Sequence, residues 1–400
     1  MKRFGLIAVL LMAVTPAWSA NRKITVAELK DMLTTMHQAA KSDQDVATAL
    51  KQVELTEELT RTEMNNVASD VPGQLSTEQL YVLEARSAVL APPAADIPST
   101  PAPDAAAQKS LLDKAVDYAT KTYGQLPELT AVKTTLRFQD NVEAVAASSG
   151  LHGSATDVSV GSGSQTSALS VRYINSADSA VALAGGAEKP SSEKDKTPWG
   201  ANGQIKATTP GPSLGAVIQE AEAAGKITWL RWETVNGKQT AVFSFGVDKK
   251  KSHYAVNYCC FPDTEQAGIM TMTGQNGAGA PGGASGAAGG AKGNFQTNTT
   301  WKNFKANVPY HGELFINDET GIVVRLVVDG EFKSSDVMHY EDTRIDYGPV
   351  TVGDKTLVLP VDSFTNTEVV PGGEDAAAKV TLRHTFLNAQ YKNYQLAGGH

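Results

Sequence analysis

Residues 311–328 read HGELFINDETGIVVRLVV, and this stretch decides the expected fold. Two short apolar runs flank the loop 317–321, in which Gly321 suits the left-handed backbone position of a longer hairpin loop. The second run, IVVRLVV, contains almost no residue of a type that acts in catalysis. The stretch therefore predicts a β-hairpin whose role is to build a sheet.

A second hairpin is predicted in WLRWETVNGKQTAVFSF, because Asn236-Gly237 is the best short-range marker of a type I′ turn. Counting outward from a two-residue turn puts Leu230 opposite Phe243, on the same face as Trp232.

Three more segments predict strands. RIDYGPVTVGDKTLVLPV forms a hairpin around Gly353-Asp354, in which Pro360 indicates an edge or a bulge. LSVRYINSADSAVALA (169–184) is typical of a hairpin, and VTLRHTFLNAQYKNYQL (380–396) of a last strand pair. Successive hairpins predict a large, mostly antiparallel sheet.

Residues 21–90 have the period of helices instead. Thr25 and Glu28 form a capping box, Ser42 opens a second helix and Thr56 a third, and Ser76 begins another capping box. Short amphipathic helices cannot bury their apolar stripes singly, so we expect a small helical bundle.

The remaining segments define the expected domains. The Pro/Ala-rich stretch 91–108 is a semi-rigid linker, although a helix is expected over about 105–123, and 212–225 is a helix closed by Gly225. Residues 274–294 hold nine glycines in 21 residues and predict a flexible insertion. The expected fold class is α+β, with a helical domain (21–90) and a curved antiparallel β domain (109–396) that carries a packed helix.

The N-terminus predicts export. Lys2 and Arg3 precede the apolar run 4–14, and small residues at 17–20 suit a cleavage site, so residues 1–20 are expected to be a signal peptide. No cysteine lies near that site, so a lipid anchor is not expected. No later run reaches 18 apolar residues, so we expect a periplasmic or secreted protein that is not an integral membrane protein. The formal charge of −8 argues against nucleic acid as a partner.

Cys259-Cys260 is the most unusual local feature. Neighbouring side chains in a regular strand point to opposite faces, so the two thiols can share a disulfide or metal only if the strand breaks or bulges. Three readings stay open, namely two buried structural cysteines, a vicinal disulfide, and redox or metal chemistry.

Catalytic and cofactor motifs are weak. Residues 277–282 match the dinucleotide-binding glycine pattern but lie in low-complexity sequence, and the seven histidines are dispersed. We therefore expect no catalytic residues, no metal site and no cofactor, and the enzyme class is kept only as a third hypothesis.

The order of HGELFINDETGIVVRL and then RIDYGPVTVGDKTLVLP resembles the closing strands of the outer-membrane lipoprotein carrier and sorting proteins of the bacterial periplasm. The resemblance covers about 227–396 and implies a curved half-barrel with helices against its concave face. It also implies a cavity for acyl chains of lipoproteins or for other lipids. The helical region, the Gly-rich insertion and Cys259-Cys260 depart from a simple carrier.

Two leading hypotheses for function follow. In the first, the concave face binds a lipid, a lipoprotein or another apolar ligand, and the chain has no catalytic role. In the second, the protein is a scaffold in a bacterial envelope complex, and the helix 212–225 simply fills the concave face. The candidate apolar lining consists of Leu230, Trp232, Phe243, Phe245, Tyr254 and Tyr258.

Overall fold

The computed structural model describes residues 22–139, 171–189, 211–262, 301–369 and 383–398. The expected signal peptide (1–20) and the Gly-rich insertion (274–294) lie outside these residues.

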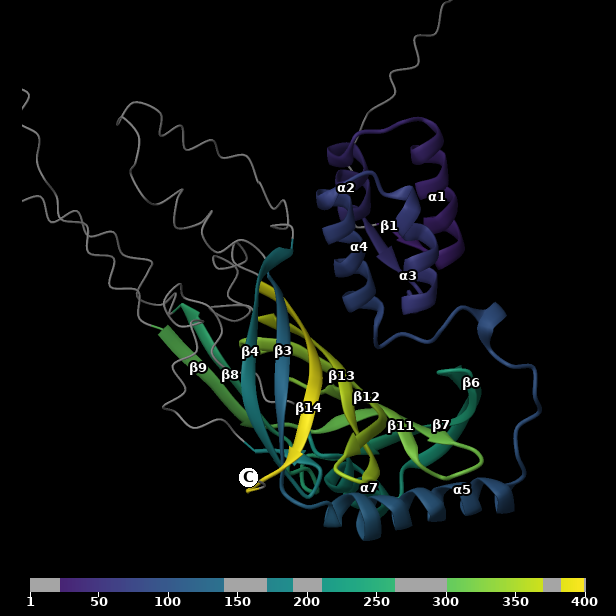
Figure 1. The fold of residues 1–400 in the computed structure, drawn as a ribbon, viewed down its shortest axis with the longest axis vertical. Helices are drawn as coiled ribbons and strands as arrows, with labels where there is room; N and C mark the ends of the chain where they lie inside the picture. Colours follow the sequence, from purple (N-terminus) through teal and green to yellow (C-terminus); the bar gives the residue numbers. More distant parts are fainter. Residues whose placement is uncertain (1–21, 140–170, 190–210, 263–300, 370–382, 399–400) are drawn as a thin grey trace, which may run out of the picture.

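The main element is an open antiparallel sheet, which confirms the α+β class and the large antiparallel sheet (Figure 1). Within the described residues it holds ten strands in the order β5-β4-β3-β14-β13-β12-β11-β10-β7-β6. The sheet does not close, because β5 and β6 at its two ends are not paired with each other. The strands are β3 (Leu129–Gln139), β4 (Arg172–Ala184), β5 (Ala187–Glu188), β6 (Ile227–Val235), β7 (Lys238–Val247), β10 (Tyr310–Asn317), β11 (Val323–Gly330), β12 (Met338–Val352), β13 (Lys355–Val369) and β14 (Arg383–Leu396).

The three strongest hairpin predictions are confirmed. Strands β10 and β11 pair around a loop in which Gly321 has φ +73°, and β12 pairs with β13 around Gly353. Asn236 and Gly237 have φ +52° and +73° between β6 and β7, as a type I′ turn requires. Pro360 lies beside a register shift in β13, which is an interior strand, so the bulge alternative applies.

Two predicted hairpins are wrong. Segment 169–184 contributes one long strand, β4, and segment 380–396 contributes one strand, β14. Both pair along most of their length with β3, so long-range pairing outweighs the local turn residues of each segment. The irregularity in β14 is a register shift between Lys392 and Gln395, where Asn393 adopts φ +54°.

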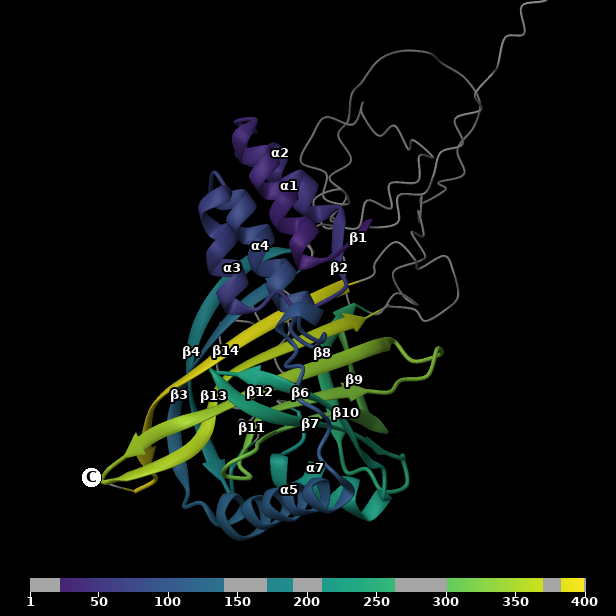
Figure 2. The same ribbon diagram turned by 90° about the vertical axis from the view of Figure 1, so that its right-hand side faces the viewer.

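Residues 22–90 form a separate helical region with its own apolar core (Figure 2). The Thr25–Glu28 capping box is present, and Ser42 caps the second helix as predicted. Thr56 does not open the third helix, which begins after Thr60, because residues 53–55 form a strand parallel to 22–24. The elements are β1 (Arg22–Ile24), α1 (Val26–Gln38), α2 (Asp43–Lys51), β2 (Val53–Leu55), α3 (Arg61–Val67), a 3₁₀ turn (Ala68–Asp70) and α4 (Gln74–Ser87).

The fourth helix begins two residues before the predicted capping box. The Asp43 carboxylate accepts hydrogen bonds from the backbone N–H groups of Leu75 and Ser76 and from the Ser76 hydroxyl. A residue from another helix therefore satisfies the donors at this helix end, so Ser76 does not act as the N-cap.

Two helices cover one face of the sheet, and the linker leads to the first of them (Figure 2). It contains a 3₁₀ turn (Ala94–Asp96) and ends at α5 (Ala105–Asp117), which continues as a π turn (Tyr118–Thr122) and a 3₁₀ turn (Tyr123–Gln125). Helix α7 (Leu214–Ala224) ends at Gly225 with φ +67°, as predicted.

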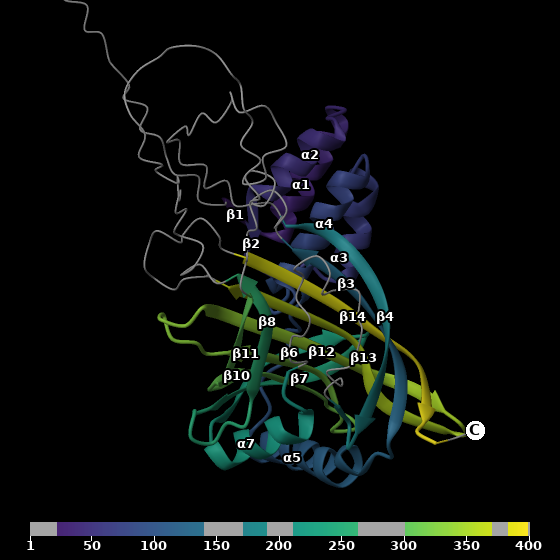
Figure 3. The same cartoon turned by 90° about the vertical axis from the view of Figure 1, so that its left-hand side faces the viewer.

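The two faces of the sheet have different partners. We call the face that packs against α5 and α7 the inner face and the opposite one the outer face. Helix α4 bridges the outer face and the helical core, because Leu80 and Leu83 pack in that core while Val82 and Ala85 pack toward the sheet. A separate two-stranded ribbon, β8 (Ala255–Pro262) and β9 (Trp301–Asn307), contributes to the inner core (Figure 3).

Candidate ligand-binding faces of the sheet

Five of the six predicted lining residues lie together in the core of the inner face. Their side chains are at most 8% exposed, and they pack with Leu214, Val217 and Ile218 of α7 and with Leu111 and Ala115 of α5. In this conformation the helices themselves fill the surface expected to hold an apolar ligand. The five residues are Trp232, Phe243, Phe245, Tyr254 and Tyr258.

Leu230 does not join them. Its side chain is 45% exposed, because β6 shifts register between Trp229 and Arg231. Trp229 rather than Leu230 lies opposite Phe243, with ring centroids 5.5 Å apart. Simple alternation from the turn therefore fails beyond the bulge, which inserts one extra residue.

The linker also contacts the aromatic group. The indole N–H of Trp232 donates to the carbonyl of Pro101 at 2.8 Å, and the Trp229 and Trp232 rings meet at 4.9 Å. The linker segment before α5 is thus tied to the edge strand β6.

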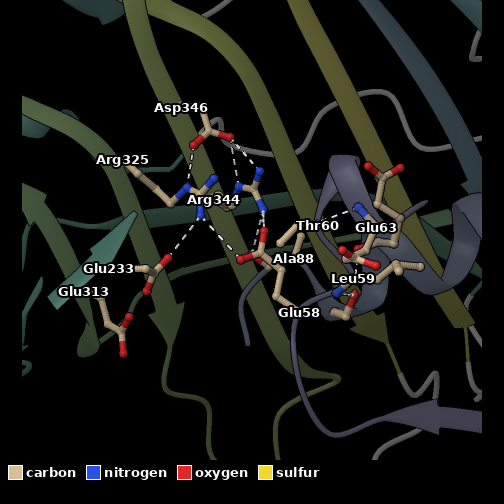
Figure 4. A network of polar contacts seen from close by, with 12 residues as sticks. Glu58, Leu59, Thr60, Glu63, Ala88, Glu233, Glu313, Arg325, Arg344 and Asp346 are labelled. Atoms are coloured by element: carbon tan, nitrogen blue, oxygen red, sulfur yellow. Dashed lines mark hydrogen bonds and ion pairs between the residues drawn. The ribbon is translucent and has the colours of Figure 1, made fainter. Parts of the chain in front are cut away.

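The outer face carries a buried chain of ion pairs that joins the helical region to the sheet (Figure 4). Glu58 accepts from Arg344 at 2.5 Å and lies 3.5 Å from Arg325. Both arginines also bind Asp346, at 2.8 and 2.6 Å. Burial alone would raise the pKa of Asp346, but the guanidinium groups of Arg344 and Arg325 outweigh it, so the pKa lies below its usual value.

The chain of charges continues to the edge of the sheet. Arg325 lies 3.7 Å from Glu233, which pairs with Arg231 at 2.9 Å. Arg231 in turn binds Glu313 through two parallel hydrogen bonds, of 3.0 and 2.8 Å. Burial raises the pKa of Glu233 despite these cations.

Backbone groups of α4 complete this interface. The carbonyls of Ala85 and Ala88 accept from the Asn366 amide and from Arg344, at 3.1 and 3.2 Å. Glu84 faces Arg61 at 2.9 Å, yet burial raises the pKa of this carboxyl to about 7. Burial raises the pKa of Asp362 to about 7 as well.

The sequence analysis did not identify this network. A signal was present, since Arg231 and Glu233, Arg325, and Arg344 and Asp346 occupy alternating positions in strands whose other positions are largely apolar. Alternation assigns such charges to a polar face, but it does not show that a helix covers that face.

The inner face contains a second polar feature, a buried band across four adjacent strands. Glu341 of β12 lies opposite Thr367, Thr367 opposite Thr385, and Thr385 opposite Gln139 of β3. These four side chains are at most 6% exposed. The Tyr254 hydroxyl donates to Glu341, whose pKa burial raises to about 7.

Histidines pair with acids in three places among the described residues, and in one of these pairs the exposed His253 lies 2.9 Å from Glu220. His311 contacts Asp329 and Glu331 at 3.1 and 3.2 Å, and the hydrogen bond that its ring donates to Asp329 raises the pKa of this histidine to about 8. His384 lies 3.5 Å from Glu368, but burial lowers its pKa to about 4. In the described part of the chain, no group of three or more His, Cys, Asp or Glu side chains is arranged to hold a metal ion.

Cys259 and Cys260 lie in β8, where the register with β9 shifts between Cys259 and Phe261. The strand therefore has a bulge at the position where two neighbouring thiols need one. Their side chains lie outside the described part of the structure, so the three readings (two structural cysteines, a vicinal disulfide, and redox or metal chemistry) all stay open.

Comparisons with known proteins give no relative. No family model, curated protein or solved structure matches the chain. Among the described helices, none is long and apolar enough to cross a bilayer.

Proposed function

We propose that this protein is an exported, non-catalytic module of the bacterial envelope that binds an apolar ligand on the inner face of its sheet. In this proposal the sheet is a half-barrel, residues 21–90 are a helical bundle attached to its outer side, and a lipid or lipoprotein is the ligand. The expected signal peptide and the resemblance to lipoprotein carrier and sorting proteins support the location and the ligand class.

One observation carries the proposal. The aromatic residues of the inner face are covered by two helices, α5 and α7, and α5 follows the linker, which contains only a 3₁₀ turn. Helices that cover a sheet through side chains alone can separate from it without breaking any strand pairing. The ligand then replaces Leu214, Val217 and Ile218 against the rings of Phe243 and Phe245.

A dansyl-labelled fatty acid tests this proposal on delipidated full-length protein. Phe245→Leu changes the inner face, and Phe364→Leu is its matched control, because Phe364 is equally buried on the outer face. We expect saturable micromolar binding that Phe245→Leu weakens several-fold and Phe364→Leu does not. Mass spectrometry of organic extracts from gently purified protein should show a bound lipid.

The second candidate is a scaffold within an envelope complex. The observation that favours it is the close packing of the inner face, where the five lining residues leave at most 8% of each side chain exposed. Well-folded protein that neither binds the probe nor carries lipid would support the scaffold. A photo-crosslinker at Tyr81, which is 37% exposed on α4, should then capture a defined envelope protein in cells.

A further inference from the structure

The buried band on the inner face contains hydrogen-bonding atoms that the protein does not use. Glu341 Oε2, Thr367 Oγ1 and Gln139 Oε1 are fully inaccessible and have no hydrogen-bond partner among the described residues. Glu341 and Thr367 are directly opposite each other, and Thr385 separates Thr367 from Gln139. Buried polar atoms are rarely left without a partner, so three in one row indicate a ligand that supplies the missing bonds.

The next row of the same face is polar at three of its four positions. Thr343 lies opposite Thr365, with hydroxyl oxygens 3.3 Å apart, Leu387 follows on β14, and Arg137 follows on β3. Thr343, Thr365 and Arg137 are 1%, 7% and 3% exposed. A core that only stabilises the fold has no need of a polar area of this extent, because apolar side chains of similar volume would fill it at lower cost.

One strand of the β8–β9 ribbon lies across the band. Tyr254 contacts Glu341 at the β12 end, and Tyr258 interacts electrostatically with Arg137 at the β3 end. The two tyrosines are four residues apart, or about 13 Å along a strand, and three strand spacings from β12 to β3 amount to about 14 Å. Residues 254–258, which comprise the first part of β8 and the residue before it, therefore cross the four strands and cover the band with two aromatic rings.

The chemistry of the band selects a class of ligand. The three atoms without a partner are a carboxyl oxygen, a hydroxyl oxygen and an amide carbonyl oxygen, and each of them can accept a hydrogen bond from a ligand hydroxyl group. The acidic Glu341 lies at the β12 end of the band and the basic Arg137 lies in the next row at the β3 end, so the site suits a ligand without net charge. Its length of about 14 Å matches a chain of two or three sugar rings, and tyrosine rings can pack on the apolar faces of such rings.

We infer that the band formed by Glu341, Thr367, Thr385 and Gln139, beneath Tyr254 and Tyr258, is a binding site for a neutral, hydroxyl-rich ligand of the carbohydrate class. Among the described residues the β8–β9 ribbon has no strand pairing with the ten-stranded sheet, so it can separate from the sheet to admit the ligand once the Tyr254–Glu341 hydrogen bond breaks. This site goes beyond the proposed apolar ligand. Tyr254 and Tyr258 belong to both sites, but the apolar ligand is proposed to bind against Phe243 and Phe245 of β7, which lie outside the band.

The test is titration of the full-length protein with maltotriose, cellotriose and chitotriose, followed by saturation-transfer NMR and calorimetry. Putrescine is the cationic comparison, since a cation would pair with Glu341. We expect saturable binding of at least one trisaccharide. No binding of any of them by folded protein at about 10 mM would overturn the inference, and so would saturable binding of putrescine alone.

Variants locate the binding. Thr367→Val removes an unused hydroxyl without changing the shape of the side chain, and should weaken trisaccharide binding about 10-fold while leaving the melting temperature unchanged or higher. Thr240→Val is the control, because the buried Thr240 hydroxyl already donates to the carbonyl of Lys238. This control should lower the melting temperature and keep the affinity.

The fatty-acid probe separates this site from the proposed function. Thr367→Val should bind the dansyl-labelled fatty acid as the wild type does, whereas Phe245→Leu should bind the trisaccharide as the wild type does. A Thr367→Val protein that keeps its trisaccharide affinity, or that melts at a clearly lower temperature, would contradict the assignment of Thr367 to a ligand site.

Discussion

Glu58 and Arg344 lie 286 residues apart in the chain, and their side chains meet at 2.5 Å between the helical region and the sheet. Both are almost inaccessible, with side chains 4% and 12% exposed. This pair connects a loop of the N-terminal region to the end of the fourth helix and to two strands, β11 and β12, because Arg344 also binds the Ala88 carbonyl and Asp346, and Glu58 also approaches Arg325.

Removing one partner of this pair should be strongly destabilising. Glu58→Ala leaves the charges of Arg325 and Arg344 buried with fewer acceptors, and we expect a loss of about 3–5 kcal/mol in the free energy of unfolding. Lys109→Ala is the control, since the Lys109–Asp113 pair is exposed and should change stability by less than about 0.5 kcal/mol. Urea unfolding followed by circular dichroism measures both, and equal effects would contradict the structural role of Glu58.

The buried Glu341 carboxyl should make stability depend on pH. Burial raises its pKa in the folded protein to about 7, so the folded state binds the proton more tightly than the unfolded chain does. The resulting stabilisation is fully present below pH about 4.5 and is lost as the pH rises through 7, by at most about 3 kcal/mol.

Glu341→Gln should remove that part of the pH dependence. The variant and the wild type should therefore have similar stability near pH 5, and the variant should become the more stable of the two as the pH rises to 8, because only the wild type has to ionise a buried carboxyl. Glu319→Gln, in the exposed loop between β10 and β11, is the control. Unfolding in urea at pH 5, 6, 7 and 8 measures the difference, and parallel curves for Glu341→Gln and the wild type would contradict the assignment.

Glycine 312 of β10 should tolerate no side chain. A Cβ at Gly312 would lie 1.9 Å from the Val327 carbonyl oxygen and 2.9 Å from the Phe245 ring. Since the nearest atom is backbone of the neighbouring strand, Gly312→Ala should destabilise the protein by about 2–4 kcal/mol. Gly246→Ala in β7, where the nearest atom is 3.7 Å away on Lys226, should lower the free energy of unfolding by less than about 1 kcal/mol. Urea unfolding followed by circular dichroism measures both variants, and equal losses would contradict the close approach at Gly312.

The bulge in β6 predicts opposite outcomes for two adjacent residues. Trp229→Ala removes a ring that packs against Phe243 and Trp232, and should lower stability by about 2–4 kcal/mol. Leu230→Ala, at a half-exposed position, should change it by less than about 0.5 kcal/mol. If urea unfolding shows a larger loss of stability for Leu230→Ala than for Trp229→Ala, the bulge would be contradicted, and the regular register counted from the Asn236-Gly237 turn would apply.

Local signals in the sequence predicted much of this fold correctly. Gly321, Asn236-Gly237 and Gly353 each adopt the positive φ that their turns require, and Gly225 and Thr25 end and begin their helices as expected. These features depend on residues close together in the chain, so the sequence alone determines them. The antiparallel sheet follows from the hairpins, and burial of Trp232, Phe243 and Phe245 from side-chain alternation.

The tertiary structure decided what the local patterns could not. Segments 169–184 and 380–396 form single strands because β3 pairs along them. The bulge at Trp229–Arg231 turns Leu230 outward, because one extra residue reverses the face of each side chain beyond it, counted from the Asn236-Gly237 turn. The ion pair of Glu58 with Arg344 and the row from Glu341 to Gln139 join residues more than two hundred positions apart. No local propensity encodes such contacts, since they exist only when distant strands and helices have packed together.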